Sequence, residues 1–463
     1  MRDSALSELL KALTSCLGAA NVLLDNNVGE RYASDWSEAV ALPPKAVLRP
    51  SSTEQLSDVM AICHDHAQPI VVQGGLTGLA GGATPQAGEI SISLERMRGI
   101  EMLDEAGMTM TAWAGTTLQE LQEAALEVDL YLPLDLAARG SCNIGGNVAT
   151  NAGGTEVIRY GMARALVLGL EVVLADGTVI SSLNTLVKNN SGFDLKQLFI
   201  GSEGTLGIIT RVVLRLQPRL LSTHTALCGL PDYPAVLALL NNLKRDFGAG
   251  MTGFEVMWDN YYRSVIQQTP GATSPFQSEY PFYVLIEYKE NAPVAAAARF
   301  ESVLCEQLEK GVMIDALIAQ SSQDAAKFWQ IRDGIGTLLK QLGPVSNQDV
   351  SLPIALIGEF AQELETLLKE RYANLEILYF GHLGDNNMHA VAYTGRIEDT
   401  SPIGEDIMQM IGRYGGAVTA EHGIGVLKKK YLSLSRTDNE IALMKRLKQA
   451  LDPHDILNRG RVI

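Results

Sequence analysis

The chain has 463 residues, of which 46% are hydrophobic and 19% charged, and this length predicts two or three packed domains. The formal net charge of −16 argues against a nucleic-acid partner, because phosphate binding needs clustered Lys and Arg. The five cysteines are scattered and form no C-x-x-C pair, which is typical of reduced thiols in a cytoplasmic protein. No run of 18 apolar residues occurs, so no transmembrane segment is predicted.

The amino-terminal region is predicted to alternate helices and strands. Residues 4–18 carry leucines at helical spacing, which predicts an amphipathic helix packed on a core. Residues 45–50 and 69–75 predict strands on either side of a helix that begins near Ser52 or Thr53. This β-α-β order is typical of a layered α+β or α/β domain.

The middle of the chain changes character at Pro218. Before it, residues 165–181 predict a hairpin that turns at Asp176-Gly177, and residues 204–218 predict a strand that ends at Pro218. After it the glycine-rich loops disappear and a separate α+β domain is predicted. Its expected elements are helices at 233–248 and 292–311 and a strand at 281–289, and a last helix is expected at 438–453.

Three glycine-rich stretches lie in the first half of the chain, at 71–85, 139–161 and 199–210. Glycines that follow a strand let backbone N–H groups point into one concavity and bind phosphate oxygens. The first stretch is not G-x-G-x-x-G, and no G-x-x-x-x-G-K-[ST] motif occurs, which disfavours a nicotinamide site and an ATPase. Each stretch alone would also fit a mobile surface loop. Together they predict a long ligand with phosphates at one end and a ring at the other.

Two of the seven histidines lie in one short stretch, "GHLGDNNMHA", at His382 and His389. A helix would separate them by about 10 Å along its axis, and one straight strand would send them to opposite faces. A hairpin of residues 375–382 and 389–393 would instead make them cross-strand neighbours, with Cβ atoms about 5 Å apart. The stretch therefore predicts two metal-ligating imidazoles, the alternative being histidines that cap turns.

A third ligand is expected from "TAEHGIG" (419–425), which supplies Glu421 and His422. Two histidines and one carboxylate form a common metal set with open positions for substrate. Glu421 and His422 would point apart on a straight strand, so a kink is needed there, and Gly423 permits one.

These stretches resemble the vanillyl-alcohol oxidase flavoprotein superfamily, and in particular its D-2-hydroxyglutarate and D-lactate dehydrogenase branch. The similar segments include "LPLDLAARGSCNIGGNVATNAGG", "FDLKQLFIGSEGTLGIIT", "GHLGDNNMH", "AEHGIGVLKKKYL" and "LDPHDILN". The resemblance implies an α+β fold with a bipartite FAD-binding domain of two α/β subdomains, an antiparallel-sheet substrate (cap) domain and a C-terminal helical segment. The expected divisions are 1–218, 219–425 with the metal site, and 426–463, which would pack back on the FAD domain.

The resemblance also implies the site residues. FAD is expected to bind noncovalently, since no His or Cys lies between 74 and 82. Its expected contacts are Gln73, Gly74, Gly75, Leu76, Thr77, Gly78, Leu79, Gly82, Pro133, Leu134, Gly140, Ser141, Ile144, Gly145, Gly146, Asn147, Thr150, Asn151, Gly204, Ile209 and Asn458. His382, His389 and Glu421 match the family's metal ligands, with zinc as the first choice and manganese or iron as alternatives. His422 matches the catalytic base.

Substrate residues are expected at Arg332 and Asn387 and at three positions that depart from the family's pattern. Asn347, Gly336 and Val391 stand where the hydroxyglutarate enzymes have a lysine, a hydroxyl residue and an asparagine. Losing a cation and two polar groups would weaken binding of a second carboxylate. The expected substrate is therefore D-lactate or a related D-2-hydroxy monoacid.

The sequence leaves other substrates and reactions open. D-2-hydroxyglutarate is the alternative substrate, and a flavin-dependent alkyl transferase of the same fold is the more remote alternative. Electrons are expected to pass to a quinone or an electron-transfer flavoprotein, and a homodimer is one expected assembly.

Overall fold

The computed structural model describes residues 2–463, with side chains from Leu6 onward. The chain divides into two compact units. The first unit comprises residues 1–154, 160–219 and 421–463, and the second comprises residues 155–159 and 220–420. The linear division at 218/219 and 425/426 stays a prediction of the sequence.

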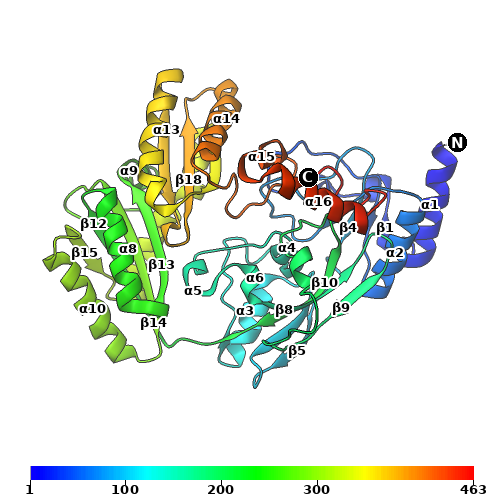
Figure 1. Ribbon diagram of the computed structural model, residues 1–463, viewed down its shortest axis with the longest axis horizontal. Helices are drawn as coiled ribbons and strands as arrows, with labels where there is room; N and C mark the ends of the chain where they lie inside the picture. Colours follow the sequence, from blue (N-terminus) through cyan, green and yellow to red (C-terminus); the bar gives the residue numbers. More distant parts are fainter. Residues whose placement is uncertain (1) are drawn as a thin grey trace. The chain divides into compact units, whose positions relative to one another are not determined.

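The first unit contains two main sheets (Figure 1). One has the order β1-β2-β4-β3, in which β2, β4 and β3 are parallel and β1 is antiparallel to β2. The other has the order β5-β6-β10-β8-β9 and is antiparallel throughout. Their strands are β1 (Val22–Leu23), β2 (Val47–Leu48), β3 (Ile70–Gln73), β4 (Ile90–Ser93), β5 (Ile100–Asp104), β6 (Thr109–Trp113), β8 (Val167–Val173), β9 (Val179–Ser182) and β10 (Ile208–Arg215).

Helices begin where the sequence offers caps. The side chain of Ser52 accepts a hydrogen bond from the backbone of Gln55, and Thr117 forms a capping box with Glu120. The amphipathic first helix buries Leu9, Leu13 and Leu17, as the leucine spacing predicted. The helices that carry residues of this unit are α1 (Arg2–Leu17), α2 (Thr53–Asp65), α3 (Leu118–Glu127), α4 (Ile144–Ala149), α5 (Val157–Tyr160), α6 (Ala163–Leu166), α7 (Lys196–Phe199), α15 (Leu432–Ser435) and α16 (Asp438–Leu451).

The predicted hairpin at 165–181 is confirmed, and the predicted end of the following strand is corrected. Strands β8 and β9 pair through Val173 and Val179, and Gly177 in the turn has φ +87°. Strand β10 stops at Arg215, before Pro218. Pro218 instead lies in the short strand β11 (Gln217–Pro218), which pairs with β7 (Leu130–Tyr131).

The second unit is built on one seven-stranded antiparallel sheet with the order β15-β12-β14-β13-β17-β18-β16. This confirms the expected antiparallel sheet, and the strand expected at 281–289 is β14. The strands are β12 (Ser222–Leu230), β13 (Met251–Trp258), β14 (Phe282–Glu290), β15 (Asp315–Ile318), β16 (Ser346–Ser351), β17 (Glu376–Gly381) and β18 (Asn387–Tyr393).

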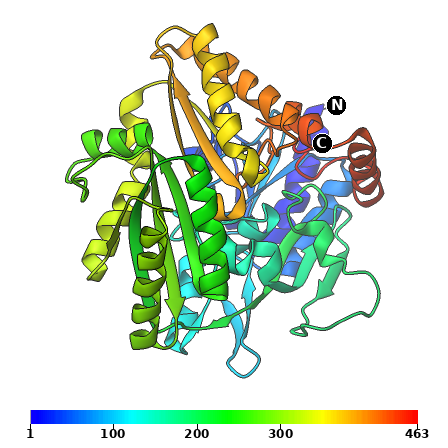
Figure 2. The same ribbon diagram turned by 60° about the vertical axis from the view of Figure 1, so that its left-hand side comes forward.

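Helices cover both faces of this sheet. Helices α8 (Tyr233–Phe247) and α10 (Pro293–Glu309), both predicted, lie together on one side of the strands in Figures 1 and 2. The other face packs apolar residues such as Met257, Phe380 and Val391 against α9 (Asp259–Gln268), α11 (Ser322–Arg332) and α12 (Ile335–Leu342). The remaining helices of this unit are α13 (Ile357–Arg371) and α14 (Ile397–Arg413). Among the described residues, no helix has both the length and the apolar character needed to cross a membrane.

Candidate active site

A cavity of about 370 Å³ opens in the first unit, lined by all three glycine-rich stretches. It lies after β3, along α4 and at the start of β10, and Glu421 and His422 also line it. The expected cofactor contacts that line it are Gly74, Gly75, Leu76, Thr77, Gly78, Leu79, Gly82, Gly145, Gly146, Asn147, Thr150, Gly204, Ile209 and Asn458.

Glycine is required here because the loops pack backbone against backbone. A Cβ on Gly75 would collide with the carbonyl oxygen of Ser141, and a Cβ on Gly145 would collide with Ala114. Gly146, one residue further along α4, has open space where its Cβ would be. The cavity wall is therefore largely main chain, and it fits a long ligand that is held by backbone groups.

Seven expected cofactor contacts do not line the cavity: Gln73, Pro133, Leu134, Gly140, Ser141, Ile144 and Asn151. Two of them instead make hydrogen bonds to main-chain groups. The buried amide of Gln73 donates to the carbonyl oxygens of Tyr32 and Ala83, and the Asn151 side chain accepts from the backbone N–H of Arg164.

Other lining residues had no signal in the sequence. Asp35 lies far before the first glycine loop, yet its carboxylate accepts hydrogen bonds from Thr84 and from the backbone of Ala83. Trp36 beside it also lines the cavity although its side chain is largely exposed. Neither residue belongs to a glycine-rich or histidine motif, so pattern reasoning passes over both.

Asn458 joins two parts of the cavity wall. Its side-chain oxygen accepts from the N–H of Val72 at 2.9 Å, and its nitrogen donates to the carbonyl of Glu203 at 2.6 Å. Its φ of +42° is one that asparagine tolerates better than most residues. Both polar atoms are thus used to hold the end of β3 beside the 203–204 turn.

The histidine hairpin forms, but in a different register from the one expected. The direct cross-strand partner of His389 is Phe380, and His382 lies just past β17, before the 3₁₀ turn Leu383–Asp385. His382 and His389 are therefore diagonal neighbours, with ring centroids 6.0 Å apart. The expectation of directly opposed histidines was wrong because β18 begins at Asn387, two residues before His389, and this register pairs His389 with Phe380.

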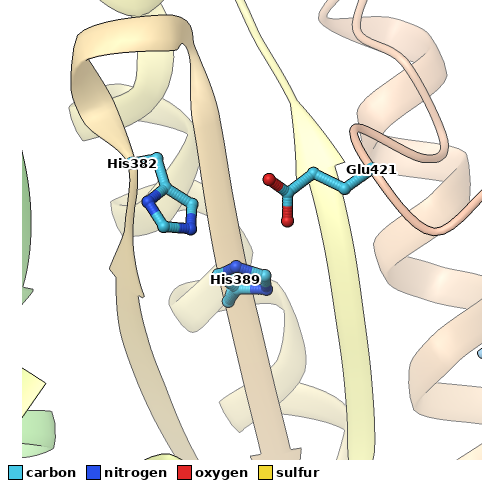
Figure 3. Close-up of side chains that lie close together, drawn as sticks. All are labelled: His382, His389 and Glu421. Atoms are coloured by element: carbon cyan, nitrogen blue, oxygen red, sulfur yellow. The ribbon is translucent and has the colours of Figure 1, made fainter. Parts of the chain in front are cut away.

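The two imidazoles nevertheless lie close to the Glu421 carboxylate. One ligand atom from each of His382, His389 and Glu421 lies within 4.8 Å of the other two, and both histidines are buried. Figure 3 shows the Glu421 carboxylate pointing toward the two imidazoles. Both polar atoms of the Asn387 side chain, two residues before His389, are buried without a hydrogen-bond partner among the described residues. Two imidazoles, a carboxylate and an unsatisfied amide are donor groups that fit a divalent cation and a polar ligand.

A buried carboxylate holds the loop that follows Glu421 and His422. Gly423 has φ +80°, the kink that the sequence predicted. Glu203 accepts from the N–H groups of Ile424 at 2.6 Å and Gly425 at 2.8 Å, and burial raises the pKa of Glu203 despite these bonds. Glu421 itself accepts from the N–H of Gly154.

A second buried carboxylate, on β13, also escaped the sequence reasoning. Glu255 binds Nε of Arg332 at 2.7 Å and Nδ1 of His382 at 2.7 Å. Burial alone would raise the pKa of Glu255, but the Arg332 charge and the hydrogen bonds from His382 and Arg332 outweigh burial and lower it. The Arg332 guanidinium also lies 5.2 Å from the ring centroid of Phe380.

The three departures from the family's pattern occupy different surroundings. Asn347 and Val391 are cross-strand partners on β16 and β18, and Asn347 is exposed whereas Val391 is fully buried. Gly336 lies on α12, with open space where a Cβ would be.

Comparisons with known proteins agree with this geometry. A solved structure of p-cresol methylhydroxylase superimposes with a TM-score of 0.79 over 99% of this chain and 97% of that one, at 17% identity, which establishes a shared fold. A family model described as FAD binding domain matches residues 44–182, and one described as FAD linked oxidases, C-terminal domain, matches residues 221–462.

Two relatives align over nearly all of this chain. The mitochondrial D-2-hydroxyglutarate dehydrogenase of Arabidopsis thaliana is 37% identical over 96% of this chain and 80% of its own length. The D-2-hydroxyglutarate dehydrogenase of Xanthomonas citri pv. viticola is 38% identical over 94% of this chain and 92% of its own length.

The two FAD-linked domains and the full-length relatives identify the chain as a flavoprotein of the vanillyl-alcohol oxidase superfamily. Within it, the chain belongs to the FAD-linked oxidase family and is an FAD-dependent dehydrogenase.

Proposed function

We propose that the protein oxidises a D-2-hydroxy acid to the 2-oxo acid with noncovalently bound FAD and a divalent cation, of which zinc is the first choice. One observation carries the proposal. Glu421 belongs both to the group with His382 and His389 and to the lining of the glycine-rich cavity, and His422 lines the same cavity. A cation ligand and a base are thus adjacent in the chain at one cavity.

The chemistry divides between cofactors and side chains. When bound, FAD supplies the hydride acceptor, and the cation supplies positive charge that lowers the pKa of the substrate hydroxyl. His422 takes the hydroxyl proton as general base. Arg332 binds the substrate carboxylate, with its charge held in place by Glu255. Asn387 orients the substrate through its unsatisfied amide.

D-2-hydroxyglutarate is the substrate that the comparisons favour. The relatives named above are both D-2-hydroxyglutarate dehydrogenases, and this supports the alternative better than the expected monoacid. D-lactate remains a second candidate because of one observation. The strand positions beside His389 hold Asn347 and Val391, which offer no positive charge to a second carboxylate. A quinone or an electron-transfer flavoprotein is proposed as the electron acceptor.

Anaerobic reduction of the bound flavin tests the function. The purified protein is mixed with D- and L-2-hydroxyglutarate and with D- and L-lactate, and loss of visible flavin absorbance is followed. Reduction by D-2-hydroxyglutarate that exceeds reduction by the other three is expected. A flavin that none of the four acids reduces would remove the proposal, and faster reduction by D-lactate would favour the second candidate.

A further inference from the structure

Glu255 is an ionisable side chain on the face of the sheet that packs Met257, Leu285 and Phe380 in one apolar cluster. It is 1% exposed, its partner on β14 is Leu285, and Met257 follows it on the same face of β13. Burying a carboxylate among such residues is costly unless it is paired and hydrogen-bonded. Strand pairing alone does not require a carboxylate there.

The two oxygens of Glu255 hold two different residues. Oε2 accepts from Nε of Arg332, and Oε1 lies 2.7 Å from Nδ1 of His382. The register explains the second contact. Strands β13 and β17 pair Met257 with Phe380 and Val256 with Gly381, so continuing the ladder by one residue places Glu255 opposite His382. The carboxylate thus fixes His382 at the point where β17 ends.

The contacts of the imidazole of His382 select one tautomer. An ionised carboxylate only accepts hydrogen bonds, so Nδ1 beside Glu255 carries the proton. Nε2 therefore keeps its lone pair. Nη2 of Arg332 lies 3.1 Å from Nε2 and 3.4 Å from Nδ1, and a cation bound at Nε2 would take the place of this contact. In Figure 3 one ring nitrogen of His382 faces His389 and Glu421 and the other faces away. Since Nδ1 is bound to Glu255, the nitrogen that faces them is Nε2.

We propose that Glu255 is the positioning residue of the cation site, an inference that rests on the proposed function. It acts on the metal through His382 by fixing the ring orientation and the Nδ1–H tautomer. With its other oxygen it fixes Arg332. The Glu255 carboxylate thus positions both the metal ligand His382 and the guanidinium that binds the substrate. Carboxylates that bind the second nitrogen of a metal-ligating histidine affect metal affinity by about 10- to 100-fold.

The test compares Glu255→Gln and Glu255→Asp with Glu287→Gln in the intact protein. Glu287 is a matched control because it lies on the neighbouring strand β14 of the same sheet and is paired with Lys289 and Thr252, away from His382. The protein is stripped of metal, and the affinity for Zn²⁺ is measured by competition with a chelator. Glu255→Gln is expected to weaken Zn²⁺ binding by about 10- to 100-fold, with Glu287→Gln unchanged.

Glu255→Asp is included to separate loss of positioning from a folding defect. It keeps the charge that pairs with Arg332, but its side chain is one methylene shorter and cannot reach both partners at their present distances. Weaker Zn²⁺ binding by Glu255→Asp, with an unchanged melting temperature and unchanged FAD content, supports positioning. Wild-type affinity for Zn²⁺ in either folded Glu255 variant would overturn this inference but not the proposed cation site. Failure of the wild-type protein itself to bind Zn²⁺ would overturn the proposed cation site, and the inference with it.

Discussion

Asn347 and Val391 are direct cross-strand partners, and the next pair on the same face of strands β16 and β18 is Asp349 and His389. The two residues that depart from the family's pattern are therefore one step along the strands from a proposed cation ligand. Asn347 is exposed and can be exchanged without disturbing the core, whereas Val391 is packed with Phe380 and Leu378. Position 347 is thus the better place to alter substrate preference.

Asn347→Lys is expected to raise kcat/KM for D-2-hydroxyglutarate relative to D-lactate. A hydrogen bond to a charged group contributes about 1.5–3 kcal/mol, so the preference should shift by about ten- to a hundredfold. Steady-state kinetics with both acids measure the shift. Gln348→Lys, one residue along and facing the other way, is the control. An equal shift in both variants would show a general effect of charge.

His422→Asn is expected to slow flavin reduction by about 10²- to 10⁴-fold, because the variant cannot take the hydroxyl proton. Stopped-flow absorbance under anaerobic conditions measures the rate, and FAD content is measured on the same sample. His66→Asn, at an exposed position after α2, is the matched control. A His422 variant that keeps the wild-type rate would assign the base to another group.

Metal removal is expected to abolish reduction of the flavin by 2-hydroxy acids while FAD stays bound. The ligand atoms of His382, His389 and Glu421 are close enough for one cation, whereas the glycine-lined cavity needs none. Metal content by mass spectrometry and flavin absorbance are compared before and after chelation, and Zn²⁺, Mn²⁺ and Fe²⁺ are added back in turn. Undiminished reduction by a metal-free protein would contradict the proposed site.

Asn458→Ala is expected to lower the free energy of unfolding by about 1–3 kcal/mol, since the N–H of Val72 and the carbonyl of Glu203 lose their side-chain partner. It should also weaken FAD binding, because both partners line the cavity. Thermal melts and FAD release measure the two effects. Asn374→Ala is the control, since Asn374 also has positive φ but is exposed. An equal loss of stability in both variants would show that the effect comes from the positive φ of Asn458 and not from its side-chain hydrogen bonds.

Glu171 is expected to make stability depend on acid pH. Burial raises its pKa, but hydrogen bonds from Arg211, Thr53 and Thr210 outweigh burial and lower it. A lowered folded-state pKa means that this stabilisation is present above the unfolded-state pKa and lost as the pH falls through the folded-state pKa. Glu171→Gln should therefore be less stable near neutral pH and lose less on acidification. Denaturant unfolding across pH, with exposed Glu127→Gln as the control, checks this.

The sequence predicts the parts of this protein that depend on local pattern. The glycines at 74–82 and 145–146 identify the cavity wall, and the turn at Asp176-Gly177 identifies its hairpin. "GHLGDNNMHA" and "TAEHGIG" identify the three residues that the fold brings together. The register of His382 was not predictable, because it depends on β18 beginning at Asn387 rather than at His389.

What escaped prediction depends on contacts distant in the chain. Glu255 is a single carboxylate in the strand "MTGFEVMW". Its role depends on contacts with Arg332 and His382, which are 77 and 127 residues away in the chain. Glu203 lies in a predicted glycine loop, but its hydrogen bonds go to a loop more than two hundred residues later. The electron acceptor and the homodimer stay predictions.

The path of the chain restricts how the protein can be dissected. It passes from one unit to the other after Gly154, Arg159, Arg219 and Ala420. A fragment that stops at Arg219 would keep the glycine loops but lack Glu421, His422 and Asn458, which complete the cavity wall. Neither unit can therefore be expressed as one contiguous segment. We expect a split protein to regain its cofactor only when both fragments are supplied together, which would make flavin uptake a direct reporter of reassembly.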